Sequence, residues 1–540
     1  MNTDSETPTA SVPPSPRKRR YHDEILKQHA RRNFIAFLLA VSSALAYLGW
    51  SIWHIDYRYW YIAGPYIFAE ALSFISMLLW SEMMMHRREH APSGLPLQHP
   101  PPPVDVIITC CGEPFAIVEK TLRAAVAIKY PDFSVTVAND RHSADLEKLC
   151  AELGVKYLAR PTHEHRKAGN LNYALAHTNK PFLHLLDADQ ISHRRILEVL
   201  IGYFAVPTIG FVTTYQAFDV PEGDPWGNRD RVFYGAMQTS RNASNSAISC
   251  GSGVVYRREA LKQIGGFSTW NLVEDLYSSL LMHAVGWKSV YHPFPATHGT
   301  APAEITGHVR QRWQWAVDSL RLIFWRNPMF TKGLSWEQRL NYLSFGYNYL
   351  LFGLAYPIFY LLPIWGLFSG CFFMKTTALD FFLWRMPYAI TFFIFNRLVT
   401  ERRHTTKAFR AQAALFEVYI SAIIAALFSR THLPRYSVTK KVSEAPILIE
   451  RLNHVLPHIA IMALSLSSVV YGFFHRGGNE VFYYLNAAWA LWVIWTLLPF
   501  TLLALRDPDE KRIKKSYEKR NKQNTEPAVA EWGVDEFPSV

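Results

Sequence analysis

The chain has 540 residues, of which 49% are hydrophobic and 14% aromatic, and its formal net charge at pH 7 is +12. A single soluble domain is excluded, because a mean hydropathy near zero in so aromatic a chain averages a strongly apolar part with a polar one. The basic residues form short runs beside apolar stretches, for example at 17–20 and 511–515. Such runs are typical of the cytoplasmic flanks of membrane helices, so we expect membrane lipid, and no nucleic acid, as their partner.

In chain order, the polar, basic and Pro-rich residues 1–32 predict a disordered N-terminal tail. Apolar runs of about 20 residues, the length that spans a hydrocarbon core, predict two membrane helices within 33–80 and four within 331–505. These six runs are 34–53, 61–80, 346–369, 379–398, 456–474 and 482–505. Between the two groups lies a polar segment, 92–330, and a basic tail follows at 506–540.

The distribution of Lys and Arg sets the expected orientation. The short loops at 54–60, 370–378 and 475–481 are poor in basic residues. The positive-inside rule therefore places both termini and the 92–330 segment of this multi-pass membrane protein in the cytoplasm. We interpret the apolar run 409–428 as an interfacial helix, because a seventh span would move the basic tail outside.

Ionisable residues in or near the predicted spans need a polar environment. Glu70, Asp380 and Arg385 are of this kind. Such groups usually face a polar path or one another, although those near span ends can also reach the membrane surface.

Segment 92–330 alternates short apolar runs with helical patterns. Strands are predicted at 104–109, 133–138 and 182–186, with helices at 115–128 and 144–153. This alternation predicts an α/β domain with a parallel sheet. Ligands bind at the carboxyl ends of such strands, so the polar residues that follow each strand are the candidates for a site.

Acidic residues follow these strands. Glu113 follows the first strand, Asp140 the second, and Asp187 and Asp189 the third. Paired carboxylates can hold Mg²⁺ or Mn²⁺ together with a diphosphate, because hard cations prefer oxygen ligands. The alternative is that a D-x-D pair merely caps a helix or a turn.

Six motifs in a fixed order carry a family resemblance. They are Asp140, HRKAGNLN at 165–172, DAD at 187–189, SCGSG at 249–253, VED at 273–275 and QRWQW at 311–315. This order resembles processive family 2 glycosyltransferases, above all cellulose synthases, with hyaluronan and chitin synthases as relatives of the same core. The resemblance covers roughly residues 30–505. It implies a multi-pass α-helical membrane protein that carries a cytoplasmic GT-A-type α/β domain over 92–330 and a membrane channel region over 331–505.

The resemblance also implies roles for individual residues. Asp275 would be the general base, with Glu274 beside it, although an acidic helix start is the simpler interpretation of this pair. Asp187 and Asp189 would hold Mg²⁺ or Mn²⁺. The residues implied to bind UDP-sugar or the growing polysaccharide are Asp105, Thr109, Glu113, Asp140, Lys167, Asp187, Asp189, Cys250, Gly251, Ser252, Gln311, Arg312, Trp315, Thr439 and Lys441.

A loop near the C-terminal part of the chain also resembles the family. The segment RYSVTKK at 435–441 resembles its gating loop, which we place at 431–443, with Thr439 and Lys441 touching the diphosphate. Gln314 departs from the pattern, because the family's Q-x-x-R-W motif has Arg at this position, and Tyr436 stands where Phe is usual. Arg312 or Arg310 could replace the missing arginine, and the sequence leaves this open.

The resemblance implies an inverting enzyme that polymerises UDP-glucose into a cellulose-like β-glucan and moves it across the membrane. A β-1,3- or mixed-linkage glucan, or a chitin- or hyaluronan-like product, stays open. A non-processive membrane glycosyltransferase and a transporter are the remaining alternatives. An accessory subunit is a further expected partner, since cellulose synthases often work with one.

Overall fold

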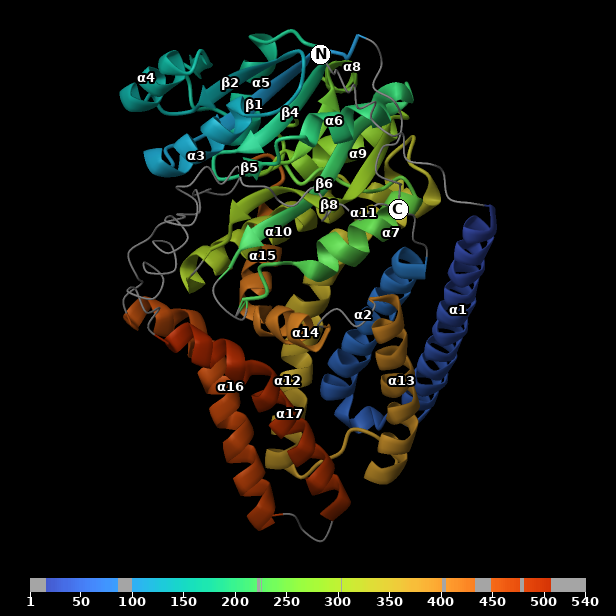
Figure 1. Cartoon of the computed structure of the whole chain (residues 1–540). Coiled ribbons are helices and arrows are strands. Elements are labelled where there is room, and N and C mark those ends of the chain that lie inside the picture. Colours follow the sequence, from blue (N-terminus) through green and yellow to red (C-terminus); the bar gives the residue numbers. More distant parts are fainter. Residues whose placement is uncertain are drawn as a thin grey trace, which may run out of the picture.

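The computed structural model describes residues 16–85, 100–220, 224, 226–302, 304–400, 405–432, 448–475 and 480–506. It has an α/β part and, beneath it in Figure 1, a set of long helices drawn from both ends of the chain. Helix α1 (Pro16–Trp53), which precedes the α/β part in sequence, packs against α13 (Ala378–Val399), which follows it. The α/β part is therefore inserted between two groups of helices that pack together.

A mixed sheet of eight strands forms the centre of the α/β part, in the order β3-β2-β1-β4-β7-β6-β8-β5. The strands are β1 Val104–Cys110, β2 Phe133–Asn139, β3 Lys156–Ala159, β4 Phe182–Asp187, β5 Ile191–Ser192, β6 Ile209–Asp219, β7 Val254–Arg257 and β8 Lys288–Thr300. Strands β3, β2, β1 and β4 are parallel, so the carboxyl ends of β1, β2 and β4 meet at one edge.

The prediction of a parallel sheet is confirmed for this half and wrong for the other. Strand β7 runs antiparallel to both β4 and β6, and β5 runs antiparallel to β8. Strand β6 returns to a parallel pairing with β8. The partners of β7 are distant in sequence, so local alternation of strands and helices carries no information about its direction.

Helices cover both faces of the sheet. They are α3 Phe115–Val126, α4 Ala144–Glu152, α5 Arg166–Ala176, α6 Ile196–Ile201, α7 Gln238–Ala243, α8 Arg258–Gln263 and α9 Asp275–Ala284. Apolar residues of α3, α4 and α6 pack in one buried cluster against the sheet. Those of α5, α8 and α9 pack in a second cluster on the opposite face. Each face is therefore buried, as the continuous apolar strand sequences require.

Six helices of the described residues are long and apolar enough to cross a membrane. They are α1, α2 (Trp60–Met85), α11 with α12 (Trp336–Leu350 and Tyr356–Ser369), α13, α16 (Leu448–His475) and α17 (Glu480–Leu505). Each of the six apolar runs predicted as spans lies in one of these helices. Residues 351–355 join α11 and α12 through a π-helical turn, so the third span begins ten residues earlier than the apolar run. The predicted disorder is wrong for residues 16–32, which lie in α1.

The run predicted as one interfacial helix over 409–428 is two helices. α14 (Thr405–Ala414) and α15 (Phe416–Phe428) meet at Leu415 with a bend of 56°. α15 packs against α10 (Ile305–Trp325), which lies where the α/β part meets the long helices (Figure 1). Helices α10 and α15 thus lie together at the boundary between the α/β part and the long helices.

Candidate active site

A cavity of about 1340 Å³ opens at the carboxyl ends of the parallel strands. Most of the residues predicted from the sequence line it: Thr109, Glu113, Asp140, Lys167, Asp187, Asp189, Cys250, Glu274, Asp275, Gln311, Arg312 and Trp315. They come from segments spread over about 200 residues of sequence. The sheet brings them together because the ends of β1, β2 and β4 lie side by side.

Lys167, at the start of α5, is the electrostatic centre of this group. Its Nζ lies 2.7 Å from Oδ1 of Asp187 and 2.9 Å from Oε1 of Glu274, and it donates to the backbone oxygen of Gly251 at 3.0 Å. Burial lowers the pKa of Lys167, but the carboxylates of Asp187 and Glu274 outweigh it and raise the pKa well above its ordinary value. The ammonium therefore stays charged at neutral pH and can face a diphosphate.

Gly169 and Asn170, which follow Lys167 in the same motif, hold the start of α5 in place. A Cβ on Gly169 would collide with the backbone of Glu164, so glycine lets α5 pack closely on the preceding loop. Asn170 donates to the backbone oxygens of Ala138 at 2.7 Å and Cys110 at 3.4 Å, which ties the ends of β2 and β1 together. These contacts fix the start of α5 against the sheet and thereby place Lys167.

The SCGSG loop passes directly over this cluster. Gly251 has φ +74°, and a Cβ there would lie 2.9 Å from Nζ of Lys167 and 3.2 Å from Oε1 of Glu274. Both the backbone conformation and the space require glycine. Ser252 Oγ accepts a hydrogen bond from the backbone N–H of Asp187 at 2.9 Å. Burial raises the pKa of the Cys250 thiol to about 12, so this thiol is not a nucleophile at neutral pH.

Glu274 and Asp275 stand at the start of α9, where the sequence predicts a helix. Both residues line the cavity, although Glu274 is only 2% exposed. Burial, and then the neighbouring Glu274, raise the pKa of Asp275 to about 7. A carboxylate with this pKa can accept a proton near neutral pH, and the role of Asp275 as the general base stays a prediction.

The other side of the cavity is formed by the ends of β1 and β2. Glu113 Oε2 accepts a hydrogen bond from the backbone N–H of Cys111 at 2.6 Å, and burial raises the pKa of Glu113. Asp140 is held by an ion pair with Arg160, which also donates to the backbone oxygen of Arg166 at 3.1 Å. Arg160 therefore links the end of β2 to the loop that precedes Lys167.

Asp105 is not part of the site, which corrects the prediction. It lies near the amino end of β1, five residues before Cys110, or about 17 Å at the strand rise of about 3.3 Å per residue. Its carboxylate is buried and pairs with Arg258 at 2.8 Å, and it accepts hydrogen bonds from Ser134 at 2.7 Å and from the Lys180 backbone at 2.9 Å. Its role is to join β1, β2 and α8.

Comparisons with known proteins agree with this geometry. Residues 101–317 match the model of the glycosyltransferase like family 2, and residues 262–405 match that of cellulose synthase. The chain carries a family 2 glycosyltransferase domain that runs into a cellulose synthase domain. The family 2 domain contains the whole strand-end site, and the overlap of the two matches contains Asp275 and the Gln311–Trp315 motif.

Three similar proteins are bacterial cellulose synthases. Cellulose synthase 1 of Komagataeibacter xylinus is 28% identical over 503 residues, 86% of this chain and 31% of that protein. Cellulose synthase 1 catalytic subunit (UDP-forming) of the same organism is 28% identical over 512 residues, 88% of this chain and 66% of that protein. The cellulose synthase catalytic subunit (UDP-forming) of Pseudomonas fluorescens is 31% identical over 322 residues, 56% of this chain and 43% of that protein.

The chain thus spans between about a third and two thirds of the length of these relatives. Among solved structures, a mannosyltransferase of Pyrobaculum calidifontis in complex with GDP-Man and Mn²⁺ is 17% identical, with a TM-score of 0.48. That match covers 67% of this chain and 99% of the other.

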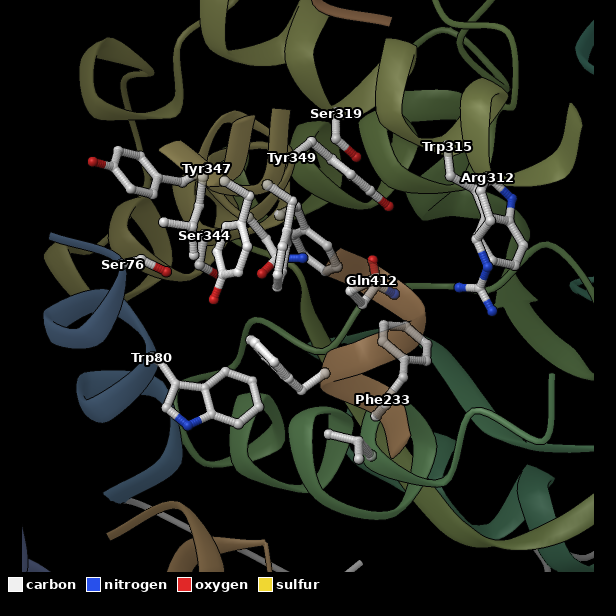
Figure 2. A pocket seen from close by; sticks show the side chains of 18 of the residues that line it. Ser76, Trp80, Phe233, Arg312, Trp315, Ser319, Ser344, Tyr347, Tyr349 and Gln412 are labelled. Carbon is white, nitrogen blue, oxygen red and sulfur yellow. The ribbon is translucent and has the colours of Figure 1, made fainter. Parts of the chain in front are cut away.

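Helix α10, which begins in the overlap of the two matches, also contributes to the site. Figure 2 shows Trp315 and Arg312 of α10 facing the same cavity as Trp80, Phe233 and Tyr349. Arg312 pairs with Asp230 at 3.1 Å, and its guanidinium lies 4.9 Å from the centre of the Trp315 ring.

Gln314, the departure from the family pattern, also lines the cavity, whereas Arg310 does not. Of the two arginines proposed to replace the missing one, only Arg312 is therefore near the site. Among the described residues, the cations that line the cavity at the α/β part are Arg166, Lys167 and Arg312. Arg166, directly before Lys167, is a candidate that the motif comparison overlooked.

The donor set of the predicted metal site fits a metal that arrives with its substrate. Within the part of the chain that the structure describes, no three or more His, Cys, Asp or Glu side chains form a metal-binding group. Asp187 and Asp189 nevertheless both line the cavity beside Lys167. Mg²⁺ is commonly bound through one or two carboxylates plus substrate phosphates, and these two residues can supply that number.

Some predicted residues cannot be placed. Thr439 and Lys441 of the predicted gating loop lie outside the described residues. Conversely, Arg160, Asn170 and Asp318 support the site and were missed. Asn170 lies inside the KAGN motif, so the motif itself was its signal. For the other two, no sequence signal points to their partners.

Proposed function

We propose that the chain is a processive, inverting glycosyltransferase that polymerises UDP-glucose into a β-glucan and moves the product through the membrane. The proposal takes its nucleotide and its sugar class from the relatives described above. The observation that carries it is the extent of the cavity. The same cavity that Lys167, Asp187 and Asp275 line continues between the long helices as far as Cys371, in the loop after α12.

The far end of the cavity supports a path to the other side of the membrane. The loops after α1 and after α12 meet there, with the backbone N–H of Asp56 donating to the oxygen of Phe373 at 2.9 Å. In Figure 1 these loops lie at the end of the long helices that is remote from the sheet. A polymer that grows at Asp275 and leaves at Cys371 would therefore cross the whole helical part.

The lining of this path suits a carbohydrate. Aromatic rings from different spans face it, among them Tyr349, Tyr356, Trp365, Trp489 and Trp492. A sugar ring presents apolar C–H faces that stack on such rings and hydroxyl groups that need hydrogen-bond partners.

Among the described lining residues of the spans, the charged ones are Glu70 and Arg385. Arg385 Nη1 donates to both carboxylate oxygens of Glu70 at 2.7 Å. The pair joins α2 to α13 and is neutral as a unit, which limits the cost of placing it in a membrane.

The chemistry assigned to the site is a single displacement. The acceptor hydroxyl gives its proton to Asp275 as its oxygen forms the new bond to the anomeric carbon. The bond from that carbon to the diphosphate breaks on the opposite face, and UDP leaves. Lys167 holds the diphosphate, and Trp315 stacks on the acceptor sugar. A Mg²⁺ or Mn²⁺ held by Asp187 and Asp189 would neutralise charge on the leaving diphosphate.

The location follows from the same proposal. The α/β part would face the cytoplasm, where UDP-sugars are made, and the six spans would lie in the bacterial inner membrane. This orientation agrees with the positive-inside rule. An accessory subunit that receives the polymer on the other side is part of the proposal.

The test uses the purified full chain with labelled UDP-glucose or UDP-N-acetylglucosamine and Mg²⁺. Products are digested separately with β-1,4-, β-1,3- and mixed-linkage-specific glucanases and with chitinase. We expect a polymer from UDP-glucose that the β-1,4-specific enzyme degrades. A polymer of another linkage or sugar would correct the product, and the transfer of one sugar per acceptor would refute processivity.

A further inference from the structure

The loop that delivers Glu274 and Asp275 is held by one buried carboxylate of another helix. Asp318 on α10 accepts hydrogen bonds from the backbone N–H of Leu272, at 2.8 Å to Oδ1, and of Val273, at 2.7 Å to Oδ2. These are the two residues directly before Glu274. Asp318 is 1% exposed, so water does not replace these bonds.

Arg321, one turn further along α10, extends the same connection. Its Nη1 donates to the backbone oxygen of Trp270 at 2.7 Å, and its guanidinium lies 4.4 Å from the centre of the Trp270 ring. Its Nε donates to the backbone oxygen of Ser429, at the end of α15, at 2.7 Å. Arg321 is fully buried and lies 3.8 Å from Asp318. The loop 270–273 is thus attached to α10 at three backbone groups.

Helix α10 also carries the motif that faces the cavity. Trp315 and Asp318 are three residues apart, which is less than one helical turn and about 4.5 Å along the axis. The helix therefore fixes the position of Trp315 and of the loop before Asp275 with the same short segment. A displacement of α10 would move both together.

A buried carboxylate is a costly way to fasten a loop. Burial raises the pKa of Asp318 to about 7, with the two backbone N–H groups and Arg321 opposing the rise. Well-packed apolar residues would stabilise a fold at least as well as a buried ion pair. What apolar packing would not supply is a fixed direction for the N–H groups of Leu272 and Val273, and hence for the start of α9.

We propose that Asp318 and Arg321 are positioning residues, which hold the loop 270–273 on α10 so that Asp275 and Trp315 keep a fixed distance for the reaction. This inference rests on the proposed role of Asp275 as the base. It assigns no contact with substrate to either residue. It predicts that loosening the loop impairs the chemical step and leaves nucleotide binding intact, because Lys167 keeps its contacts with Asp187 and the backbone oxygen of Gly251 when Glu274 shifts.

The experiment compares D318A, which removes both acceptors, with D318N, which keeps one carbonyl oxygen. The matched control is W325F, which removes a different tie between α10 and α15, the bond from Trp325 Nε1 to the backbone oxygen of Ala426. Each full-length variant is measured for kcat and KM by UDP release, for UDP affinity by calorimetry, and for amide exchange at 270–276 by mass spectrometry.

We expect D318A to lower kcat about 100-fold, the effect of a misplacement of about 1 Å in a reacting group, with D318N intermediate and W325F unchanged. KM for the UDP-sugar and UDP affinity should not change, and the amides of Leu272 and Val273 should exchange faster in D318A. If D318A binds no UDP because it does not fold, the kcat and the UDP affinity of D318N test the proposal instead. Wild-type kcat in both variants, or equal losses in kcat and UDP affinity, would overturn the proposal. A wild-type protein without transferase activity would instead refute the proposed function.

Discussion

Replacement of Asp275 by Asn removes the proton acceptor and preserves the size of the side chain. Oδ1 of Asp275 accepts a hydrogen bond from the backbone N–H of Leu276 at 2.6 Å, and an Asn oxygen can keep this bond. The ion pairs of Lys167 are with Asp187 and Glu274, so D275N leaves them in place. The variant should therefore fold and bind UDP with nearly normal affinity.

The expected loss of rate follows from the role of a general base. Such a group contributes about 10²–10⁴-fold by proton transfer, so kcat for UDP release should fall by that factor. The pH dependence provides a second measure. Asp275 is active only when deprotonated, and its pKa is about 7. The wild-type kcat should therefore decrease as the pH falls below about 7, and the residual rate of D275N should lack this dependence.

Both quantities come from one assay, which follows UDP release and polymer yield from pH 5.5 to 9, with UDP affinity from calorimetry as the control for folding. A D275N variant with normal polymer yield would remove Asp275 from the base role. A variant that loses UDP binding together with activity would show that Asp275 supports the nucleotide site instead.

Three further predictions concern the surroundings of the site. D105N leaves Arg258 buried without its charged partner and should lower the free energy of unfolding by about 3–5 kcal/mol. The control D132N breaks the exposed ion pair of Asp132 with Lys180, at 2.7 Å, and should lower it by at most about 1 kcal/mol. Thermal unfolding measures both losses, and an equal shift for the two variants would contradict the structural role of Asp105. G251A places a methyl group 2.9 Å from Nζ of Lys167 at a positive φ. The resulting strain of about 1–3 kcal/mol should displace Lys167 or the loop and weaken UDP binding about tenfold or more. Unchanged affinity in calorimetry would show that the loop accommodates the methyl group without moving Lys167. Chelation of divalent cations should stop UDP release, and Mg²⁺ or Mn²⁺ should restore it; full activity in excess chelator would exclude a metal at Asp187 and Asp189.

The sequence predicts the local elements closely, because their signals are local. Strand β1 was expected at 104–109 and is found at Val104–Cys110, and α3 begins at Phe115 as expected. The long apolar helices are equally well predicted, since a run of about 20 apolar residues is a strong signal for a helix of that length. The bend at Leu415 was missed because an apolar run specifies hydrophobicity and not direction.

The site residues were predicted from motifs, and the prediction is wrong where a motif does not say which end of a strand a residue occupies. Asp105 and Thr109 lie on the same strand, but only the carboxyl end of β1 reaches the cavity. Asp105, at the other end of the strand, instead pairs with Arg258. Asp318 could not be found from sequence, because its partners Leu272 and Val273 lie about 45 residues away and offer only backbone groups.

The central claim is that one cavity joins sugar transfer to passage through the membrane, and protection of the product in proteoliposomes tests it most directly. The chain is reconstituted and labelled UDP-glucose is added outside, so that only molecules whose α/β part faces outward react. We expect a polymer that resists externally added glucanase until detergent opens the vesicles. A polymer that the external enzyme degrades completely without detergent would contradict it.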